Sequence, residues 1–240
     1  MRPQRTLIVN ADDLGYTSAT NAGIFQAHRQ GIVTSASLMV DRPAAAEAVR
    51  EAEAMGFDDL GLHIDLGEWV WRSESWQPLY EIVDLGDAAA VAAECERQLA
   101  IFRQLTGRDP THVDSHQHVH RQEPARSAAT AIASRLGVPL RHVTDSISYE
   151  GGFYGQTGRG EPDPKQLSAT TILDILERST ADAVELGCHP GFDDALETMY
   201  RQERRREVEV LCCPDLRLGI QRLGFTLGHF TTLATGTPPA

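Results

Sequence analysis

The sequence is poor in basic residues and contains no long apolar run. Its 22 Lys and Arg residues stand against 34 Asp and Glu residues, which gives a formal net charge of −12 at pH 7. Nucleic acids and anionic membranes are bound through basic surfaces, so neither is expected as a partner, and a neutral or cationic small molecule fits better. No window approaches the roughly 18 apolar residues of a membrane-spanning helix.

The usual signs of secretion are also missing. The apolar run near the N-terminus covers only residues 7–9, which is too short for the apolar region of a signal peptide. The four cysteines form no C-x-x-C pair, and the adjacent Cys212 and Cys213 are poorly placed to bond to each other. We therefore expect a cytoplasmic protein whose cysteines, including Cys95 and Cys188, are reduced and structural.

The chain does contain a regular alternation of strand-like and helix-like segments. Short apolar, β-branched runs lie at 6–13, 33–40, 60–66, 111–118, 139–145, 183–190 and 224–230. Helical patterns lie at 17–30, 43–55, 87–106, 122–136, 168–179, 197–211 and 215–223. The alternation favours parallel strands with outer helices, as a (β/α) barrel or a doubly wound sheet. No glycine-rich nucleotide loop follows the first strand.

Two longer segments lack a regular pattern, at 67–86 and 146–164. Both follow strands, so they should lie over the mouth of a barrel, where long loops are usually functional. The first segment holds all three tryptophans, Trp69, Trp71 and Trp76. Tryptophan faces bind sugar rings well, but a packed lid or a contact in a homodimer explains them equally well.

The stretch "HVDSHQHVH" at 112–120 is the densest group of polar side chains. Its residues at even positions would share one face of a strand only while the strand stays regular, so the last histidines are expected in a loop. Burying so many imidazoles and a carboxylate without partners would be costly, so at least one should bind metal or take part in catalysis. The set is His112, Asp114, His116, His118 and His120.

Three further motifs place polar residues at strand ends. In "NADD", Asp12 or Asp13 alone is as well explained by a helix cap or a turn. In "GLHIDL", a lone strand histidine such as His63 is more often a hydrogen-bonded core residue than a ligand. In "GCHPGF", the turn after His189 leaves its imidazole at the rim, as a turn residue or as an acid–base group.

Taken together, these motifs bring Asp and His side chains from four strands to one barrel mouth. Three protein ligands and an open position make a catalytic metal site, and mixed nitrogen and oxygen ligands favour zinc or another first-row divalent ion over magnesium. Such an ion lowers the pKa of water and polarises a carbonyl, while a carboxylate takes a proton and a histidine gives one to the leaving amine. The combination predicts amide hydrolysis.

Seven motifs together resemble the YdjC-like (ChbG/HpnK) family of carbohydrate deacetylases. In family order they are "LIVNADDLG", "GIVTSASLMV", "GLHIDL", "THVDSHQHVH", "FYG" at 153–155, "ELGCHPGF" and "GFTLGHF", and they span nearly the whole chain. The resemblance implies a single catalytic domain over 1–240, with the distorted (β/α) barrel of seven to eight strands found in polysaccharide deacetylases. It also implies a metal-dependent N-deacetylase acting on chitooligosaccharide or another acetylated amino sugar.

The resemblance also implies roles for individual residues. It makes Asp13, His63 and His116 the ligands of one divalent ion, with Zn²⁺ favoured and Mg²⁺ or another ion left open. It makes Asp12 the general base and His189 the acid that protonates the departing amine, although the order of the two aspartates stays open. By the same resemblance His118 and His120 lie beside the ligands or face the substrate, and Asp114 orients an imidazole. The residues expected to contact the substrate are Asp114, His118, Tyr154 and, because tryptophan faces bind sugar rings, Trp69 and Trp71.

One departure from the family and two competing functions remain. The segment "GEWVWRSESWQPLYEIVDLGD" is shorter than its family counterpart, which makes the sugar less certain than the reaction. A metal-dependent phosphoesterase or other hydrolase is one alternative, but no Arg or Lys adjoins the motifs at 12–13, 63 or 189, although Arg121 follows the histidines. The other is a non-catalytic carbohydrate-binding protein that kept the ion for stability.

Overall fold

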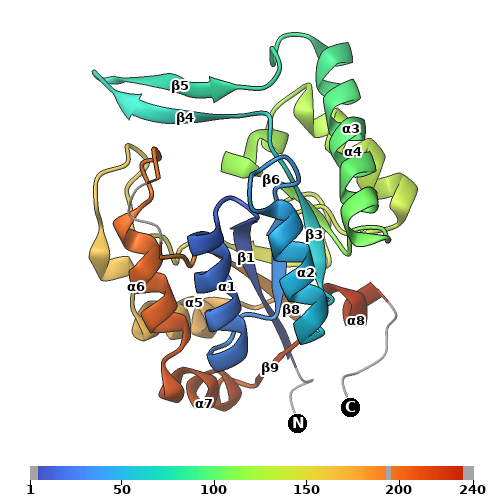
Figure 1. Ribbon diagram of the computed structural model, residues 1–240. Helices are drawn as coiled ribbons and strands as arrows, with labels where there is room; N and C mark the ends of the chain where they lie inside the picture. The colour runs from blue at the N-terminus through green and yellow to red at the C-terminus, as the bar shows by residue number, and fades with distance from the viewer. Residues whose placement is uncertain (1–4, 193–195, 235–240) are drawn as a thin grey trace.

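A curled parallel sheet runs through the centre of the molecule (Figure 1). The computed structural model describes residues 5–192 and 196–234. Within these residues the strand order is β6-β3-β2-β1-β8-β7, with β9 also paired to β1, and every pairing in this sheet is parallel. The strands are β1 (Arg5–Leu14), β2 (Ser35–Leu38), β3 (Leu60–Ile64), β6 (Val113–Ser115), β7 (Ser148–Glu150), β8 (Ala183–Cys188) and β9 (Phe225–Leu227). The predicted α/β class is confirmed, with the sheet bent into a half-barrel.

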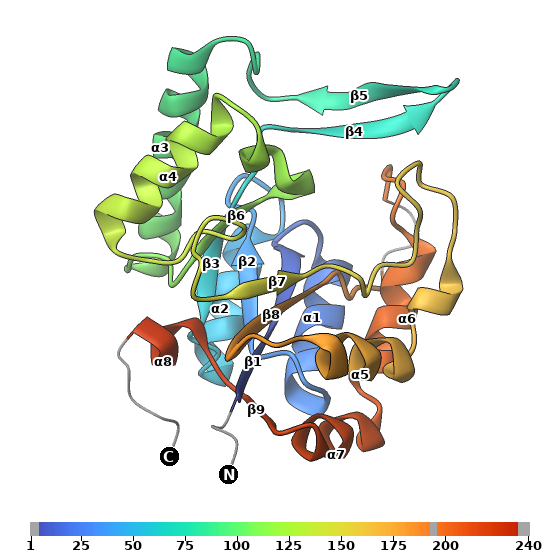
Figure 2. The same cartoon turned by 180° about the vertical axis from the view of Figure 1, so that it is seen from behind.

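Helices pack around the outside of this sheet (Figures 1 and 2). They are α1 (Ser18–Gln30), α2 (Ala45–Met55), α3 (Ala88–Thr106), α4 (Ala125–Leu136), α5 (Ala169–Arg178), α6 (Gln202–Leu211), α7 (Pro214–Arg222) and the short α8 (Phe230–Ala234). Local signals set several ends: the Asp87 carboxylate accepts from Ala89 and Ala90 N–H groups at the start of α3, and Gly107 ends that helix in the left-handed conformation. No helix in the described part of the chain is long and apolar enough to cross a membrane.

Three of the expected strands are shorter than predicted or absent. Strand β6 stops at Ser115, and the chain then forms a 3-10 helix, η1 (His116–Arg121), in which Gln117 and His118 have left-handed φ angles of 49° and 55°. The segment 139–145 forms only one bridge, between Leu140 and Val113, because the chain turns at His142 with φ 63°. The segment 224–230 divides into β9 and the start of α8.

The segment 67–86, expected to be irregular, contains an antiparallel hairpin. Strands β4 (Gly67–Arg72) and β5 (Ser75–Glu81) pair with each other and not with the main sheet. Their turn consists of Ser73 and Glu74, both with positive φ. We call residues 67–81 the tryptophan hairpin. It projects above the C-terminal ends of the central strands (Figures 1 and 2).

Candidate active site

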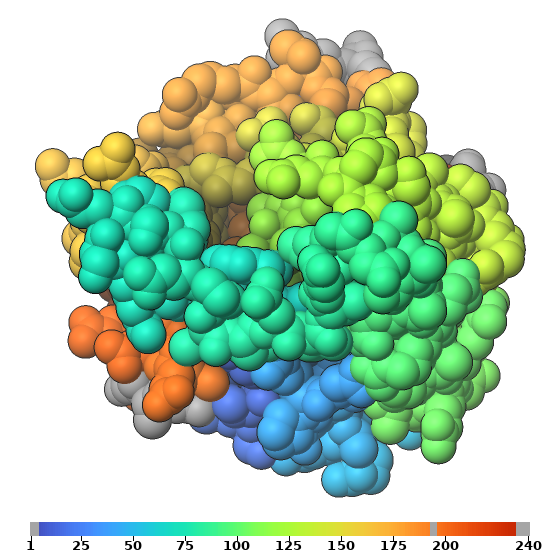
Figure 3. Space-filling view, turned by 90° about the horizontal axis from the view of Figure 1, so that it is seen from above, coloured from blue at the N-terminus to red at the C-terminus, as the bar shows by residue number. Residues whose placement is uncertain are grey.

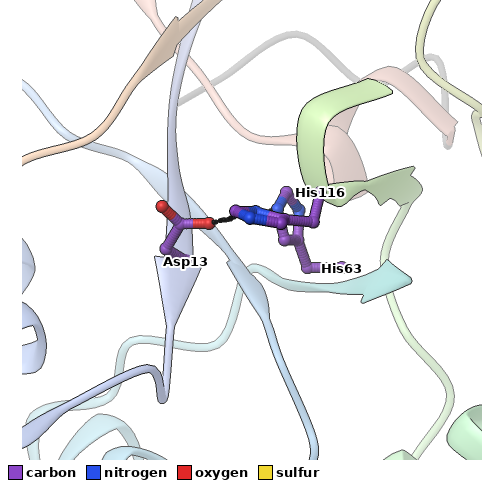
Figure 4. A group of neighbouring side chains, drawn as sticks. All are labelled: Asp13, His63 and His116. Atoms are coloured by element: carbon purple, nitrogen blue, oxygen red, sulfur yellow. Dashed lines mark hydrogen bonds and ion pairs between the residues drawn. The ribbon is translucent and has the colours of Figure 1, made fainter. Parts of the chain in front are cut away.

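Asp13, His63 and His116 meet at the C-terminal end of the sheet (Figure 4). Asp13 Oδ1 lies 3.3 Å from His63 Nε2 and 3.0 Å from His116 Nδ1, and all three side chains are buried. Metal–ligand bonds of about 2.0–2.2 Å in a tetrahedral zinc site separate neighbouring ligand atoms by about 3.3 Å. The two distances are therefore close to those of a preformed metal site.

An irregularity in β1 allows both aspartates to serve this site. The register between β1 and β2 shifts between Ala11 and Leu14, and Asp13 itself has a left-handed φ of 67°. On a regular strand the carboxylates of Asp12 and Asp13 would point to opposite faces. The bend instead lets both side chains line the same pocket.

The chemistry of the three side chains fits a divalent ion. Two imidazoles and one carboxylate supply the mixed ligands that zinc and related ions prefer. His63 Nε2 is buried and has no hydrogen-bond partner within the described chain, although it faces Asp13. An unpartnered buried nitrogen is costly, and coordination to a cation would satisfy it.

Charged neighbours hold each ligand in place. Asp114 Oδ1 lies 2.8 Å from His63 Nδ1, which leaves Nε2 as the nitrogen directed toward Asp13. Burial by itself would lower the pKa of His63, but Asp114 outweighs it and raises the pKa to about 10. Arg204 Nη2 donates to Asp13 Oδ2 at 2.6 Å and holds the pKa of Asp13 well below its usual range despite the burial. His116 resembles His63: burial alone would lower its pKa, but the carboxylates of Asp13 and Glu68 together raise it to about 9.

Asp12 is fixed by a buried arginine. Arg141 donates from Nη1 to Asp12 Oδ2 and from Nη2 to Asp12 Oδ1, both at 2.7 Å. The same guanidinium lies 2.7 Å from oxygens of Asp114 and Glu185, and only 1% of its side chain is exposed. Burial would raise the pKa of Asp12, but Arg141 outweighs this effect, so the pKa is lowered and Asp12 is a carboxylate at neutral pH.

His189 lies on the other side of Asp12. Its Nε2 is 3.8 Å from Asp12 Oδ2, and its Nδ1 is 4.0 Å from Glu207 Oε1. The backbone N–H of His189 donates to Glu207, which also accepts from the Tyr200 hydroxyl. Burial lowers the pKa of His189 to about 4, so its imidazole is neutral at pH 7.

These side chains lie in a pocket of about 780 Å³. This volume is within the range of roughly 300–1,000 Å³ that is typical of small-molecule sites. The floor of the pocket consists of Asp12, Asp13, His63, His116 and His189, and the tryptophan hairpin contributes Trp69 and Trp76. From above, the surface is hollowed between the hairpin and the segments coloured green and yellow (Figure 3).

The structure places the other sequence-predicted residues in two groups. His118, Trp69 and Tyr154 line the pocket, as expected for side chains that face a substrate. Asp114 does not line it, because it is fully buried behind His63, so a direct contact with substrate is wrong for this residue while the orienting contact is present. Trp71 also lies outside the pocket wall: its ring packs edge-on against Trp76, with centroids 5.6 Å apart.

Two histidines of the stretch 112–120 are held by neighbouring side chains away from the candidate metal site. His120 is buried, with Nδ1 at 2.5 Å from Ser115 Oγ and Nε2 at 3.0 Å from the Arg141 carbonyl oxygen. His112 stacks on Phe230, with ring centroids 3.8 Å apart. Both rings are therefore fixed away from the three candidate ligands.

Sequence reasoning missed two arginines of this site, Arg141 and Arg204. A phosphoesterase was disfavoured because no cation adjoins the sequence motifs, yet the fold brings one guanidinium to Asp12 and another to Asp13. Arg141 is ion-paired with carboxylates and does not line the pocket, whereas Arg204 lines the pocket and its Nη1 has no hydrogen-bond partner within the described chain. No local signal in the sequence marks either residue, because Arg141 is 129 positions from Asp12 and Arg204 is 191 positions from Asp13.

Comparisons with known proteins identify the family of the chain. The family model described as "YdjC-like protein" matches residues 6–222. A chitooligosaccharide deacetylase of Serratia marcescens is 30% identical over 270 residues, covering 96% of this chain and 100% of the relative. A crystal structure from Enterococcus faecalis, named for cellobiose-phosphate cleavage, has a TM-score of 0.75 at 27% identity and covers 96% of this chain and 99% of its own.

A more distant structure defines the fold class. The family 4 carbohydrate esterase of Streptomyces lividans, solved with acetate, has a TM-score of 0.56 at 10% identity and covers 93% of this chain and 92% of its own. This likeness shows a common fold and agrees with the half-barrel described above. With the family match spanning most of its length, the chain belongs to the YdjC-like family.

Proposed function

We propose that the protein is a metal-dependent hydrolase that removes the N-acetyl group from an amino sugar. One observation carries this proposal: Asp13, His63 and His116 converge at the floor of a sugar-sized pocket with a carboxylate and an imidazole beside them. The S. marcescens relative, matched over its whole length, is named for the deacetylation of chitooligosaccharides. The arrangement of these side chains and the name of this relative therefore support the same class of reaction, hydrolysis of an N-acetyl group.

The three ligand side chains would hold one divalent ion, and their type favours Zn²⁺. When bound, such an ion polarises the amide carbonyl and lowers the pKa of water. Asp114 and Arg204 keep His63 and Asp13 oriented for this purpose. The residues therefore form a site that needs little rearrangement to accept the ion.

Asp12 is the proposed general base. Arg141 keeps it ionised and fixes both of its oxygens, so it can accept a proton from water without first losing one. His189 is neutral at pH 7 and must gain a proton before it can give one to the departing amine. Asp12 Oδ2 lies 3.8 Å from His189 Nε2, which is longer than a hydrogen bond, so this gap must shorten in the substrate complex before the proton removed from water can pass to His189.

The pocket favours an uncharged sugar as substrate. Trp69, Trp76 and Tyr154 supply aromatic surface, which packs against the apolar faces of sugar rings. The carboxylates of Asp12, Asp13 and Glu68 line the same pocket and would tolerate the amine that deacetylation releases. An acetylated amino sugar of one or a few rings suits these walls.

The decisive experiment measures acetate release together with metal content. Purified wild type, Asp12→Asn and His116→Ala are incubated with a panel of acetylated amino sugars. We expect wild type to bind metal and release acetate, Asp12→Asn to keep the metal and lose activity, and His116→Ala to lose both. Undiminished acetate release by His116→Ala would overturn the metal assignment. A metal-loaded wild type that acts on no member of the panel would favour a phosphoesterase or a non-catalytic binding protein.

A further inference from the structure

The base of the tryptophan hairpin is attached to the turn that carries His116. The Gln117 side chain accepts a hydrogen bond from the Trp69 N–H at 2.9 Å and donates one to the Trp69 carbonyl oxygen at 2.8 Å. These two bonds imitate the pairing of a neighbouring strand. Gln117 directly follows His116 and has a left-handed φ of 49°, so its backbone conformation is tied to the turn.

A second contact joins the hairpin to His116 itself. Glu68 Oε2 lies 3.4 Å from His116 Nε2, while Asp13 faces the other ring nitrogen, Nδ1. The Tyr16 hydroxyl donates to the same Glu68 oxygen at 2.9 Å, and only 1% of Glu68 is exposed. Glu68 lies beside the His116 nitrogen that does not face Asp13, as Asp114 does for His63, but its contact is an ion pair at 3.4 Å where Asp114 lies at 2.8 Å, within hydrogen-bond distance. Carboxylates in this position orient metal-binding histidines.

We propose that Glu68 and Gln117 are positioning residues that couple the tryptophan hairpin to the metal-binding turn, so that ion binding at Asp13, His63 and His116 fixes the hairpin over the substrate. The inference rests on the metal role of these three residues in the proposed function. Its consequence is that an ion that holds His116 also restrains Trp69 and Trp76 in the positions in which they line the pocket. The metal thus serves substrate binding as well as the chemistry.

The sequence provides a built-in probe for this coupling. All three tryptophans, Trp69, Trp71 and Trp76, belong to the hairpin, so tryptophan fluorescence reports on the hairpin alone. Metal-free protein is titrated with Zn²⁺ while emission is recorded, and Zn²⁺ affinity is measured separately by competition with a chelator. For wild type we expect a saturable change in emission whose midpoint coincides with ion binding.

Substitutions at Gln117 separate coupling from metal binding. Gln117→Ala removes both bonds to Trp69, and Gln117→Glu keeps the acceptor but loses the donor. We expect Zn²⁺ affinity within about twofold of wild type in both, because Gln117 is not a ligand, and an emission change that decreases from wild type to Gln117→Glu to Gln117→Ala. In the same order, KM for the sugar should rise more than kcat falls. The matched control is Gln77→Ala, since Gln77 is exposed and its side chain donates to the Arg72 carbonyl oxygen and to Ser75 Oγ within the hairpin.

Glu68→Gln tests the second contact. It retains an acceptor for Tyr16 but removes the charge beside His116. We expect Zn²⁺ binding about tenfold weaker, at the lower end of the range for groups that orient metal-binding histidines.

The coupling would be overturned by a full emission change in Gln117→Ala, or by the absence of an emission change in wild type that binds Zn²⁺. Acetate release distinguishes the two proposals. If wild type shows the emission change but releases no acetate, the coupling is supported and the deacetylase function is contradicted. If wild type releases acetate but shows no emission change, only the coupling is contradicted.

Discussion

The floor of the pocket and the tryptophan hairpin above it are built in opposite ways. On the floor, His63 and Asp13 are each 1% exposed, and both aspartates are ion-paired with buried arginines. In the hairpin, Trp76 is 48% exposed, and within the described residues the two strands pair with each other and not with the main sheet. Atoms that react must be held to within fractions of an ångström, whereas a surface that receives sugars can be open and adaptable. The comparison predicts that changes to the floor alter turnover and stability, while changes to the hairpin alter substrate affinity.

The largest effect is expected from the proposed base. Asp12→Asn preserves shape but cannot accept a proton, and it should lower kcat by about 10²–10⁴-fold, the usual contribution of a positioned acid or base. KM should change little, because Asp12 belongs to the floor. Steady-state kinetics with metal-loaded protein checks this prediction. A fall in kcat smaller than about tenfold with full metal content would show that another group acts as base.

The next effect concerns stability. Arg141→Met leaves Asp12, Asp114 and Glu185 without their shared cation, and breaking a buried ion pair in this way costs about 3–5 kcal/mol of the free energy of unfolding. Urea denaturation measures the change. The control is Arg135→Met, which breaks an ion pair with Glu96 on the surface and should leave the unfolding midpoint nearly unchanged. Equal effects of the two substitutions would contradict the rigid floor described here.

Metal binding should release protons. Without the ion, Asp114 outweighs burial to raise the pKa of His63 to about 10, and Asp13 and Glu68 together do the same to raise that of His116 to about 9. Both imidazoles are then protonated at pH 7 and must lose their protons to coordinate. Two protons released correspond to an affinity that strengthens by up to about 100-fold per pH unit, and the rise ends as the pH passes these pKa values. Calorimetry in buffers of different ionisation enthalpy counts the protons, and a count near zero would show that the imidazoles of the metal-free protein are not both protonated at pH 7.

The smallest effect belongs to the hairpin. Trp76→Ala removes one aromatic surface from the pocket, and contacts of this kind contribute about 0.5–1.5 kcal/mol, so KM should rise by about 2- to 10-fold with kcat nearly constant. Ile82→Ala is the control, because Ile82 is exposed nearby but does not line the pocket. A larger loss in kcat than in binding would make the hairpin part of the catalytic apparatus and remove the contrast with the floor.

Agreement between sequence and structure is greatest where local signals decide the structure. The helix over 87–106 begins at the Asp87 cap and ends at Gly107, both of which can be recognised from sequence. The tryptophan hairpin was not recognised, because its turn is formed by Ser73 and Glu74 instead of the Asn-Gly or Gly residues that usually mark a two-residue turn. The prediction of a strand over 139–145 was wrong, because His142 has a left-handed backbone conformation that interrupts it.

The alternation of strands and helices, the family motifs, and the strand-end positions of Asp12, Asp13, His63, His116 and His189 could all be predicted from the amino-acid sequence. These features depend on side-chain periodicity and on short motifs, which act over a few neighbouring residues. The folded structure was needed to show that Arg141 and Arg204 neutralise the two aspartates, that Asp114 lies behind His63, and that Glu68 and Gln117 contact both the hairpin and the site. A charged side chain pairs with whichever opposite charge the fold brings within a few ångströms. The number of residues between two side chains in the sequence does not determine that distance.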